Sequence, residues 1–334
     1  MLLYIDGFAH ANPLRYSSGA PSSYALTATP RASGCYYCTG AAAVIRVTVP
    51  VSAEIISGVG FKAAALAAGK YLLSFWTDTA ATQHISVVLN AAGLIEVRRG
   101  NNAGPLLATG ITVIPAGVWT YLEARVTIAD SGGIVKVRLN GSTTEEINFT
   151  GDTRNAGTAT TIDAVTLSGS SAADNYSDWY ILSTAGSPNG SWLGDVAVRT
   201  LLPTGDGAAS GLTGSDGDSI NNWMNVDEIP PSGADFNSSP TPGVRDSYAL
   251  ADLPSSVTTV FAVQACVVMA KSDAGTGNAK IVTRSGGTNY APTTYTLGTT
   301  FTEYRELQET DPATSFAAWT PTTVNALEVG MEVA

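Results

Sequence analysis

The chain has 334 residues, of which only 13% are charged, and its formal net charge is −11. Basic and acidic residues number 12 and 13 up to residue 204, 0 and 6 from 205 to 243, and 5 and 9 after that. We therefore expect no nucleic-acid binding, because no basic region is present to neutralise phosphates. No apolar run has the length of a membrane-spanning helix, so we expect no membrane partner either.

Short apolar runs with period-two alternation predict strands along the first 200 residues. The clearest is a hairpin in which Leu122, Ala124, Val126 and Ile128 alternate with polar residues before the chain turns and returns through 134–140. A hairpin alone is marginally stable in water, so a second sheet must cover its apolar face. Other strands are predicted at 1–6, 40–50, 71–76, 85–89, 95–97, 146–149, 164–167, 176–182 and 192–202.

The pattern predicts an all-β chain in three parts. We expect residues 1–204 to form one β-sandwich and 205–244 to form an acidic connector rich in Gly, Ser and Pro. Residues 245–334 are expected to form a smaller β-sandwich of the jelly-roll type. In the last part, 257–271 is predicted to be a long strand with both faces buried. Shorter strands are predicted at 278–284, 295–297, 301–309 and 328–333, with a helical turn beginning at Thr320-Pro321.

The cysteines and histidines are few. Zinc needs about four ligands, and only His10 and His84 are available besides Cys35, Cys38 and Cys266, so we interpret the cysteines as strand residues. The redox state of Cys35 and Cys38 stays open. The first residues lack the basic start of a signal peptide, which favours synthesis in a reducing cytosol.

No hydrolase, metalloprotease, phosphate-binding or dinucleotide motif is present, and both histidines are expected in loops or at strand rims. A glycosidase carboxylate pair has no local signature and stays open as an alternative. We expect no catalytic residues, no cofactor and no turnover, and the ligand-binding residues, if any, are unknown.

Two groups of residues have the chemistry of binding sites. Asp216 and Asp218 offer oxygen ligands for calcium, but Ile220 stands at the fifth ligand position and a solvated acidic loop is favoured, so no metal is expected. The second group is Tyr176, Asp178, Trp179 and Tyr180, residue types that sugar-binding sites use. Strict alternation puts Trp179 on the face opposite the other three, and core packing is the favoured interpretation.

Several stretches resemble the concanavalin A-like (laminin G-like) structural proteins of tailed bacteriophages. The resemblance covers nearly the whole chain. It implies a place in the virion, in tail or capsid, with assembly in the host cytoplasm, and it implies no mechanism. The stretches are 3–8, 117–123, 135–141, 178–182, 193–203, 226–231, 245–253, 309–312 and 319–333.

We therefore expect a structural virion protein that acts through contacts with other virion proteins. Low charge and the doubly apolar stretch 257–271 favour a homo-oligomer, for which a trimer is the specific expectation. The alternative is an adhesion module that binds a host surface glycan weakly and gains strength from several copies.

Overall fold

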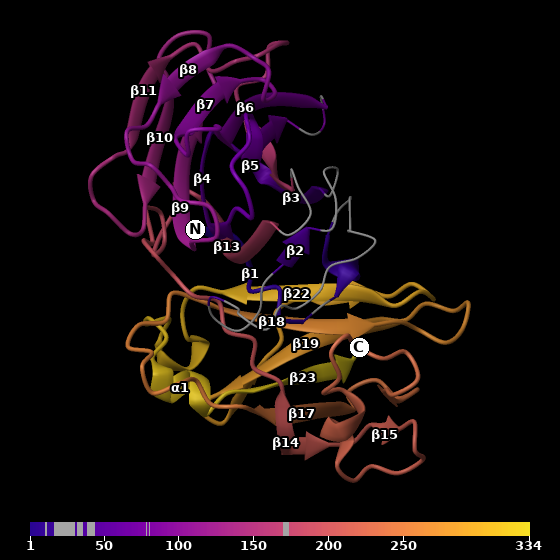
Figure 1. The fold of residues 1–334 in the computed structure, drawn as a ribbon. Helices are drawn as coiled ribbons and strands as arrows, with labels where there is room; N and C mark the ends of the chain where they lie inside the picture. The colour runs from indigo at the N-terminus through magenta and orange to yellow at the C-terminus, as the bar shows by residue number, and fades with distance from the viewer. Residues whose placement is uncertain are drawn as a thin grey trace. The chain divides into compact units, whose positions relative to one another are not determined.

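The computed structural model describes residues 1–10, 12–16, 31, 36–38, 44–77, 79, 81–169 and 174–334. The chain divides into two compact units, Met1–Arg199 and Thr200–Ala334. The all-β prediction is confirmed: both units are built from strands, and the α-helix of the described part, α1 (Pro321–Asn325), has five residues (Figure 1). No helix in these ranges has the length and apolar character needed to cross a membrane.

The first unit is a sandwich of two antiparallel sheets. One sheet has the order β1-β13-β4-β9-β10-β11, with β2 also paired to β13, and we call it sheet A. The other has the order β3-β12-β5-β6-β7-β8 and is called sheet B. The strands of sheet A are β1 (Leu2–Asp6), β2 (Tyr36–Cys38), β4 (Glu54–Lys62), β9 (Thr120–Thr127), β10 (Gly133–Leu139), β11 (Ile147–Gly151) and β13 (Asp174–Ser183). Those of sheet B are β3 (Val44–Ser52), β5 (Lys70–Thr77), β6 (Thr82–Leu89), β7 (Ile95–Arg99), β8 (Leu106–Thr109) and β12 (Ile162–Ser168).

The predicted hairpin lies within sheet A as β9 and β10. Val135 pairs with Val126, and Val137 pairs with Ala124. All four side chains are fully buried in the core between the two sheets. The alternation in the sequence therefore located the inner face of this hairpin correctly, because successive side chains of a strand point to opposite faces.

The second unit begins at Thr200 and takes in the segment predicted as a connector. β14 (Pro203–Ser210) pairs with β17 (Arg245–Leu250) at one edge of a six-stranded sheet. The segment 205–244 is thus part of the second unit, and it starts with a strand. The other strands of this sheet are β19 (Asn278–Ser285), β20 (Thr288–Tyr290), β21 (Thr294–Thr296) and β23 (Glu328–Val333).

Asp246 on β17 holds in place the part of segment 205–244 that follows β14. Its fully buried carboxylate accepts hydrogen bonds from the backbone N–H groups of Gly211 and Leu212 and from the side chains of Asn222 and Tyr248. The segment also carries the short pair β15 (Thr213–Gly214) and β16 (Asn237–Ser238) and the 3₁₀ helix η3 (Asn222–Asn225). Hydrogen bonds to one carboxylate hold much of this segment, and such bonds need no apolar periodicity in the sequence.

The long strand predicted at 257–271 is shorter in the structure. β18 (Val263–Met269) pairs with β22 (Thr302–Gln308), and residues 257–262 lie outside it. Ala265 and Met269 pack on the larger sheet, whereas Cys266 is exposed. The prediction that both faces are buried is therefore wrong. The helical turn is confirmed, since the Thr320 side chain caps α1.

His84 was expected in a loop or at a rim, but it is fully buried within β6. Its Nδ1 accepts a hydrogen bond from the Asn155 N–H at 3.3 Å, and its Nε2 lies 3.1 Å from the Thr77 hydroxyl oxygen. Burial, and then the positive charge of Arg154, lower the pKa of His84 below its ordinary value of 6.5. The ring is thus held neutral between two strands and a loop.

A neutral buried histidine makes stability depend on pH. Below about pH 6.5 the unfolded chain binds a proton at His84 that the folded chain does not, so the free energy of unfolding should fall as pH falls, by up to about 1.4 kcal/mol per unit. Urea unfolding at pH 7.5, 6.5 and 5.5 measures this slope. His84→Gln should be less stable at pH 7.5, and its free energy of unfolding should change less with pH. An unchanged slope in that variant would contradict the assignment.

Candidate functional site

The four residues considered for sugar binding lie on β13, and all are fully buried. Tyr176 and Trp179 both point into the core, where the Tyr4 ring meets Trp179 edge-on at 5.2 Å. Strict alternation had placed Trp179 opposite Tyr176, which is wrong. The register shifts between Ser177 and Tyr180, and Asp178 has a φ of 54°, so a bulge reverses the alternation.

Residues 192–199, which we call the strap, cross the outer face of sheet A. They were predicted to be a strand, but they join no sheet. Two of their backbone N–H groups bind carboxylates instead: Gly194 donates to Glu123 at 2.9 Å, and Val198 donates to Asp178 at 2.8 Å. The Arg31 guanidinium donates both to the Val196 carbonyl and to Asp178. Side chains of sheet A and Arg31 thus bond the Gly194 and Val198 N–H groups and the Val196 carbonyl of the strap.

The polar groups under the strap are bonded to one another. Tyr180 donates its hydroxyl hydrogen to Glu123, and Tyr121 donates to the backbone carbonyl of Asp178 at 3.0 Å. Burial, and then the Glu123 carboxylate, raise the pKa values of Tyr121 and Tyr180 well above the ordinary value. Burial also raises the pKa of Asp178, opposed by the Val198 N–H and by Arg31. The two phenols therefore stay protonated, and this cluster fixes the strap.

Two glycines on β4 make room for this cluster. A Cβ on Gly58 would collide with the ring of Tyr180, and one on Gly60 would lie 3.0 Å from the Arg31 side chain. The alternation Gly58-Val59-Gly60 leaves the outer face of β4 bare while Val59 fills the core. Such a pair of glycines in a strand signals a covered outer face, and predictions from apolar alternation alone missed it.

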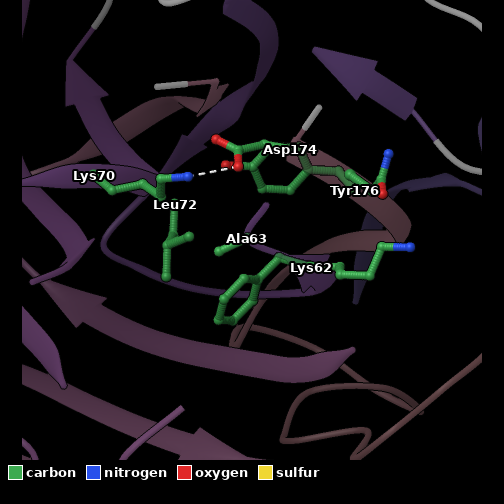
Figure 2. Close-up of a pocket in the computed structure, with 8 residues that line it drawn as sticks. Lys62, Ala63, Lys70, Leu72, Asp174 and Tyr176 are labelled. Atoms are coloured by element: carbon green, nitrogen blue, oxygen red, sulfur yellow. Dashed lines mark hydrogen bonds and ion pairs between the residues drawn. The ribbon is translucent and has the colours of Figure 1, made fainter. Parts of the chain in front are cut away.

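A small hollow lies where β13 begins, and an ion pair fills it (Figure 2). Lys70 on sheet B reaches Asp174 on sheet A at 2.6 Å, and the same carboxylate oxygen accepts the Ala64 N–H at 3.0 Å. Lys62 points away from this pair in Figure 2. The remaining space does not admit a water molecule. The pair is therefore a buried link between the two sheets, and not a ligand site.

A partly exposed aromatic side chain lies nearby on the outer face of sheet A. Trp119 precedes β9, is half-buried, and has the Lys62 ammonium 5.4 Å from its ring centre. Lys62 pairs in register with Asn175, whose buried side-chain nitrogen Nδ2 has no hydrogen-bond partner among the described residues. An indole, a cation and an amide side by side are groups that sugar-binding sites use.

His10, the other histidine, belongs to a network around Asp6. Its Nε2 lies 2.9 Å from Asp6 Oδ1, which also accepts the Phe8 N–H. Asp6 further accepts hydrogen bonds from Tyr4 and Tyr16. Burial favours the neutral acid, but Arg15, His10 and these bonds outweigh it, so the pKa of Asp6 lies well below its usual range. The network fixes the chain after β1. In the sequence, the stretch Asp6-Gly-Phe8 is the feature that could have indicated it.

The other predicted groups are placed as follows. Asp216 and Asp218 are exposed, and their carboxylates accept the backbone N–H groups of Asp218 and Ile220. Within the described ranges, no three His, Cys, Asp or Glu side chains gather as metal ligands would. Cys266 is an exposed cysteine on β18, and its Sγ accepts a hydrogen bond from the Gln264 side chain. Cys38 ends β2, and Cys35 lies outside the described residues, so their redox state is still open.

An exposed apolar area on the first unit was not predicted. Ile111, Val113 and Leu106 are 87%, 62% and 51% exposed, and Leu107 and Phe149 lie partly buried at the edge of the core. We call these five residues the side surface. The signal for it was a sequence without a single charged residue from 100 to 122.

Glu146 fixes the loop that carries the side surface. Its carboxylate accepts the backbone N–H groups of Ile111 and Thr112 and the Thr112 hydroxyl. Burial favours the protonated acid, but these bonds outweigh it and lower the pKa of Glu146. The loop is also tied by the Ile114 N–H to the Gly93 carbonyl. The aliphatic side chains are thus presented on a fixed backbone.

No protein-family model matches the chain, and no curated protein matches it in sequence. Solved structures of similar fold include domain 4 of AbnA, an extracellular arabinanase from Geobacillus stearothermophilus, in complex with arabinotriose (16% identity, TM-score 0.37, covering 54% of this chain and 91% of that chain). Others are the cellulose-induced protein Cip1 (15%, 0.40, 55% and 100%) and the carbohydrate-binding module CBM66 from Bacillus subtilis (12%, 0.30, 47% and 87%). These similarities concern fold alone.

The strap should depend on Asp178. Asp178→Ala removes the acceptor of the Val198 N–H and one partner of Arg31, and it places alanine in a left-handed conformation, so we expect a loss of about 3 kcal/mol in urea unfolding. Asp178→Asn keeps an oxygen acceptor and tolerates that conformation, and should lose less than half as much. Equal losses in the two variants would mean that the strap does not depend on this carboxylate.

Proposed function

We propose that this protein is a structural component of a tailed-bacteriophage particle, in the tail or the capsid, assembled in the host cytoplasm and acting through protein-protein contacts. The sequence resemblance supports the location. The side surface carries the proposed mode of action, because exposed apolar residues that gather at one edge of a protein are typical of interaction sites. Other virion proteins are the proposed partners.

The chemistry of the side surface favours a protein partner over a sugar. Its exposed residues Leu106, Ile111 and Val113 are aliphatic. They present no ring for a sugar to stack on and no side-chain hydrogen-bonding group. Because Glu146 already fixes the loop, little conformational entropy remains to be lost when a partner covers it. Such preorganised aliphatic anchors suit a packed protein contact.

We also propose that the chain has no catalytic turnover. The carboxylates and phenols under the strap, Glu123, Asp178, Tyr121 and Tyr180, are buried and bonded to one another or to backbone groups. A glycosidase pair would need two carboxyl groups facing a substrate. Incubation of the protein with host capsule or lipopolysaccharide tests this directly, and shortened polysaccharide chains would refute it.

Loss of the side surface should impair incorporation into particles. In a phage that carries the double variant Ile111→Ser/Val113→Ser, we expect the copy number per purified particle to fall at least about tenfold, which corresponds to about 1.4 kcal/mol. Val51→Ser is the matched control, because Val51 is also an exposed valine, 65% accessible, on the far strand β3. Normal incorporation of the double variant would overturn the proposed role of this surface.

A host glycan is the second candidate ligand, and the half-exposed Trp119 with Lys62 and Asn175 is the observation that favours it. Under this proposal the protein is an adhesion module of the particle. Single sites of this kind bind on the order of millimolar, and several copies on one particle recover strength.

Titration of the protein with host surface polysaccharide fragments, followed by tryptophan fluorescence and NMR, tests the glycan proposal. Trp119→Ala should lose at least about tenfold in affinity, whereas Trp119→Phe keeps a ring and should lose less. In the phage, Trp119→Ala particles should assemble normally and adsorb poorly. Equal binding by the two variants, or normal adsorption of Trp119→Ala particles, would count against a glycan at this site.

A further inference from the structure

The side of the first unit that carries the side surface is formed by two sheet edges to which no further strand of the described residues is paired. β8 is the last strand of sheet B, β11 is the last strand of sheet A, and the two lie beside each other (Figure 1). An edge strand has a row of backbone N–H and C=O groups without a strand partner on its outer side. Both sheets therefore end on the same side of the first unit.

These two edge strands lack two of the features by which proteins prevent strands from pairing across molecules, namely charged residues and prolines within the strand. Neither β8, Leu106-Leu-Ala-Thr109, nor β11, Ile147-Asn-Phe-Thr-Gly151, contains a charged residue or a proline. The opposite edge of sheet B is β3, which contains Arg46 and Pro50. A charged residue protects an edge strand because an incoming strand would bury the charge. A proline protects it because it has no N–H to donate to that strand. Only one of the two ends of sheet B is protected in this way.

We propose that β8 pairs antiparallel with β8 of a second copy of this chain, around a two-fold axis. Antiparallel pairing is self-complementary, so one patch can meet itself, as a two-fold interface requires. Because β8 itself carries no charged residue, no like charges of this strand face each other in the pair. Leu106, Ile111 and Val113 flank the edge and become buried in the same contact.

The proposed function assigns a protein partner to the side surface, and on that basis a second copy of this chain is its first partner. The pairing makes a dimer through the first unit, whereas the sequence led us to expect a trimer through the apolar stretch 257–271. β18 is shorter than that stretch and Cys266 on it is exposed. The open edge of β8 is the stronger basis for self-association.

Light scattering on the eluting peak of a size-exclusion column tests the proposal with the full chain at about 1 to 100 µM, the usual working range for dissociation constants near 1 µM. One chain has a mass of 34.3 kDa, and we expect the eluting species to have twice this mass. Thr109→Lys places two ammonium groups across the new strand pair and should weaken the dimer at least about tenfold. Thr143→Lys adds the same charge at an exposed loop residue and should not change the mass.

Hydrogen exchange provides a second readout that does not depend on folding yield. The β8 amides should exchange more slowly in the wild type than in Thr109→Lys, while amides of β9 and β10 stay equally protected in both. A monomeric wild type at 100 µM, a trimer, or a dimer that Thr109→Lys leaves intact would each overturn the inference.

The outcome is separable from that of the proposed function. A monomeric chain that still requires Ile111 and Val113 for incorporation would refute self-pairing, leave the structural role standing and assign the side surface to a different virion protein. A dimer that is not incorporated into particles would refute the structural role and leave the pairing standing.

Discussion

A backbone N–H needs an acceptor, and in this molecule carboxylates supply it at several places where the chain leaves a sheet. Glu123 and Asp178 hold the strap, Glu146 holds the loop of the side surface, and Asp246 holds the segment after β14. A donor left unsatisfied costs about 1 to 3 kcal/mol, and a carboxylate is a stronger acceptor than a carbonyl. The acidic residues of a chain with few charges are therefore largely structural.

Sequence patterns predicted most strands of the first unit, because alternation is imposed by burial of one face, but they missed β4 and β8. They also predicted α1, since Thr320 and Pro321 form a local capping signal. The strap was taken for a strand because its apolar residues alternate in the same way as those of a ladder strand. What distinguishes it is that the Gly194 and Val198 N–H groups have their acceptors on β9 and β13, far away in the sequence.

The candidate sites were less predictable for the same reason. Aromatic and acidic residues on β13 suggested a sugar site, but the bulge at Asp178 and the bare β4 glycines turn them into packing and fastening groups. A bulge and a covering segment are tertiary features without a local signature. The side surface did have a local signature, a long stretch without charged residues. The structure was needed to show that Ile111 in this stretch is exposed and that its backbone is fixed by Glu146.

The strap ends at Arg199, and the second unit begins at Thr200. Tension applied to the chain at Thr200 would therefore act on the strap before it acts on β13, the strand that precedes the strap. The bond of Val198 to Asp178 lies nearer the junction than that of Gly194 to Glu123, so it would take this load first. Along this path, side-chain acceptors would bear the tension ahead of the ladder hydrogen bonds of the sheets.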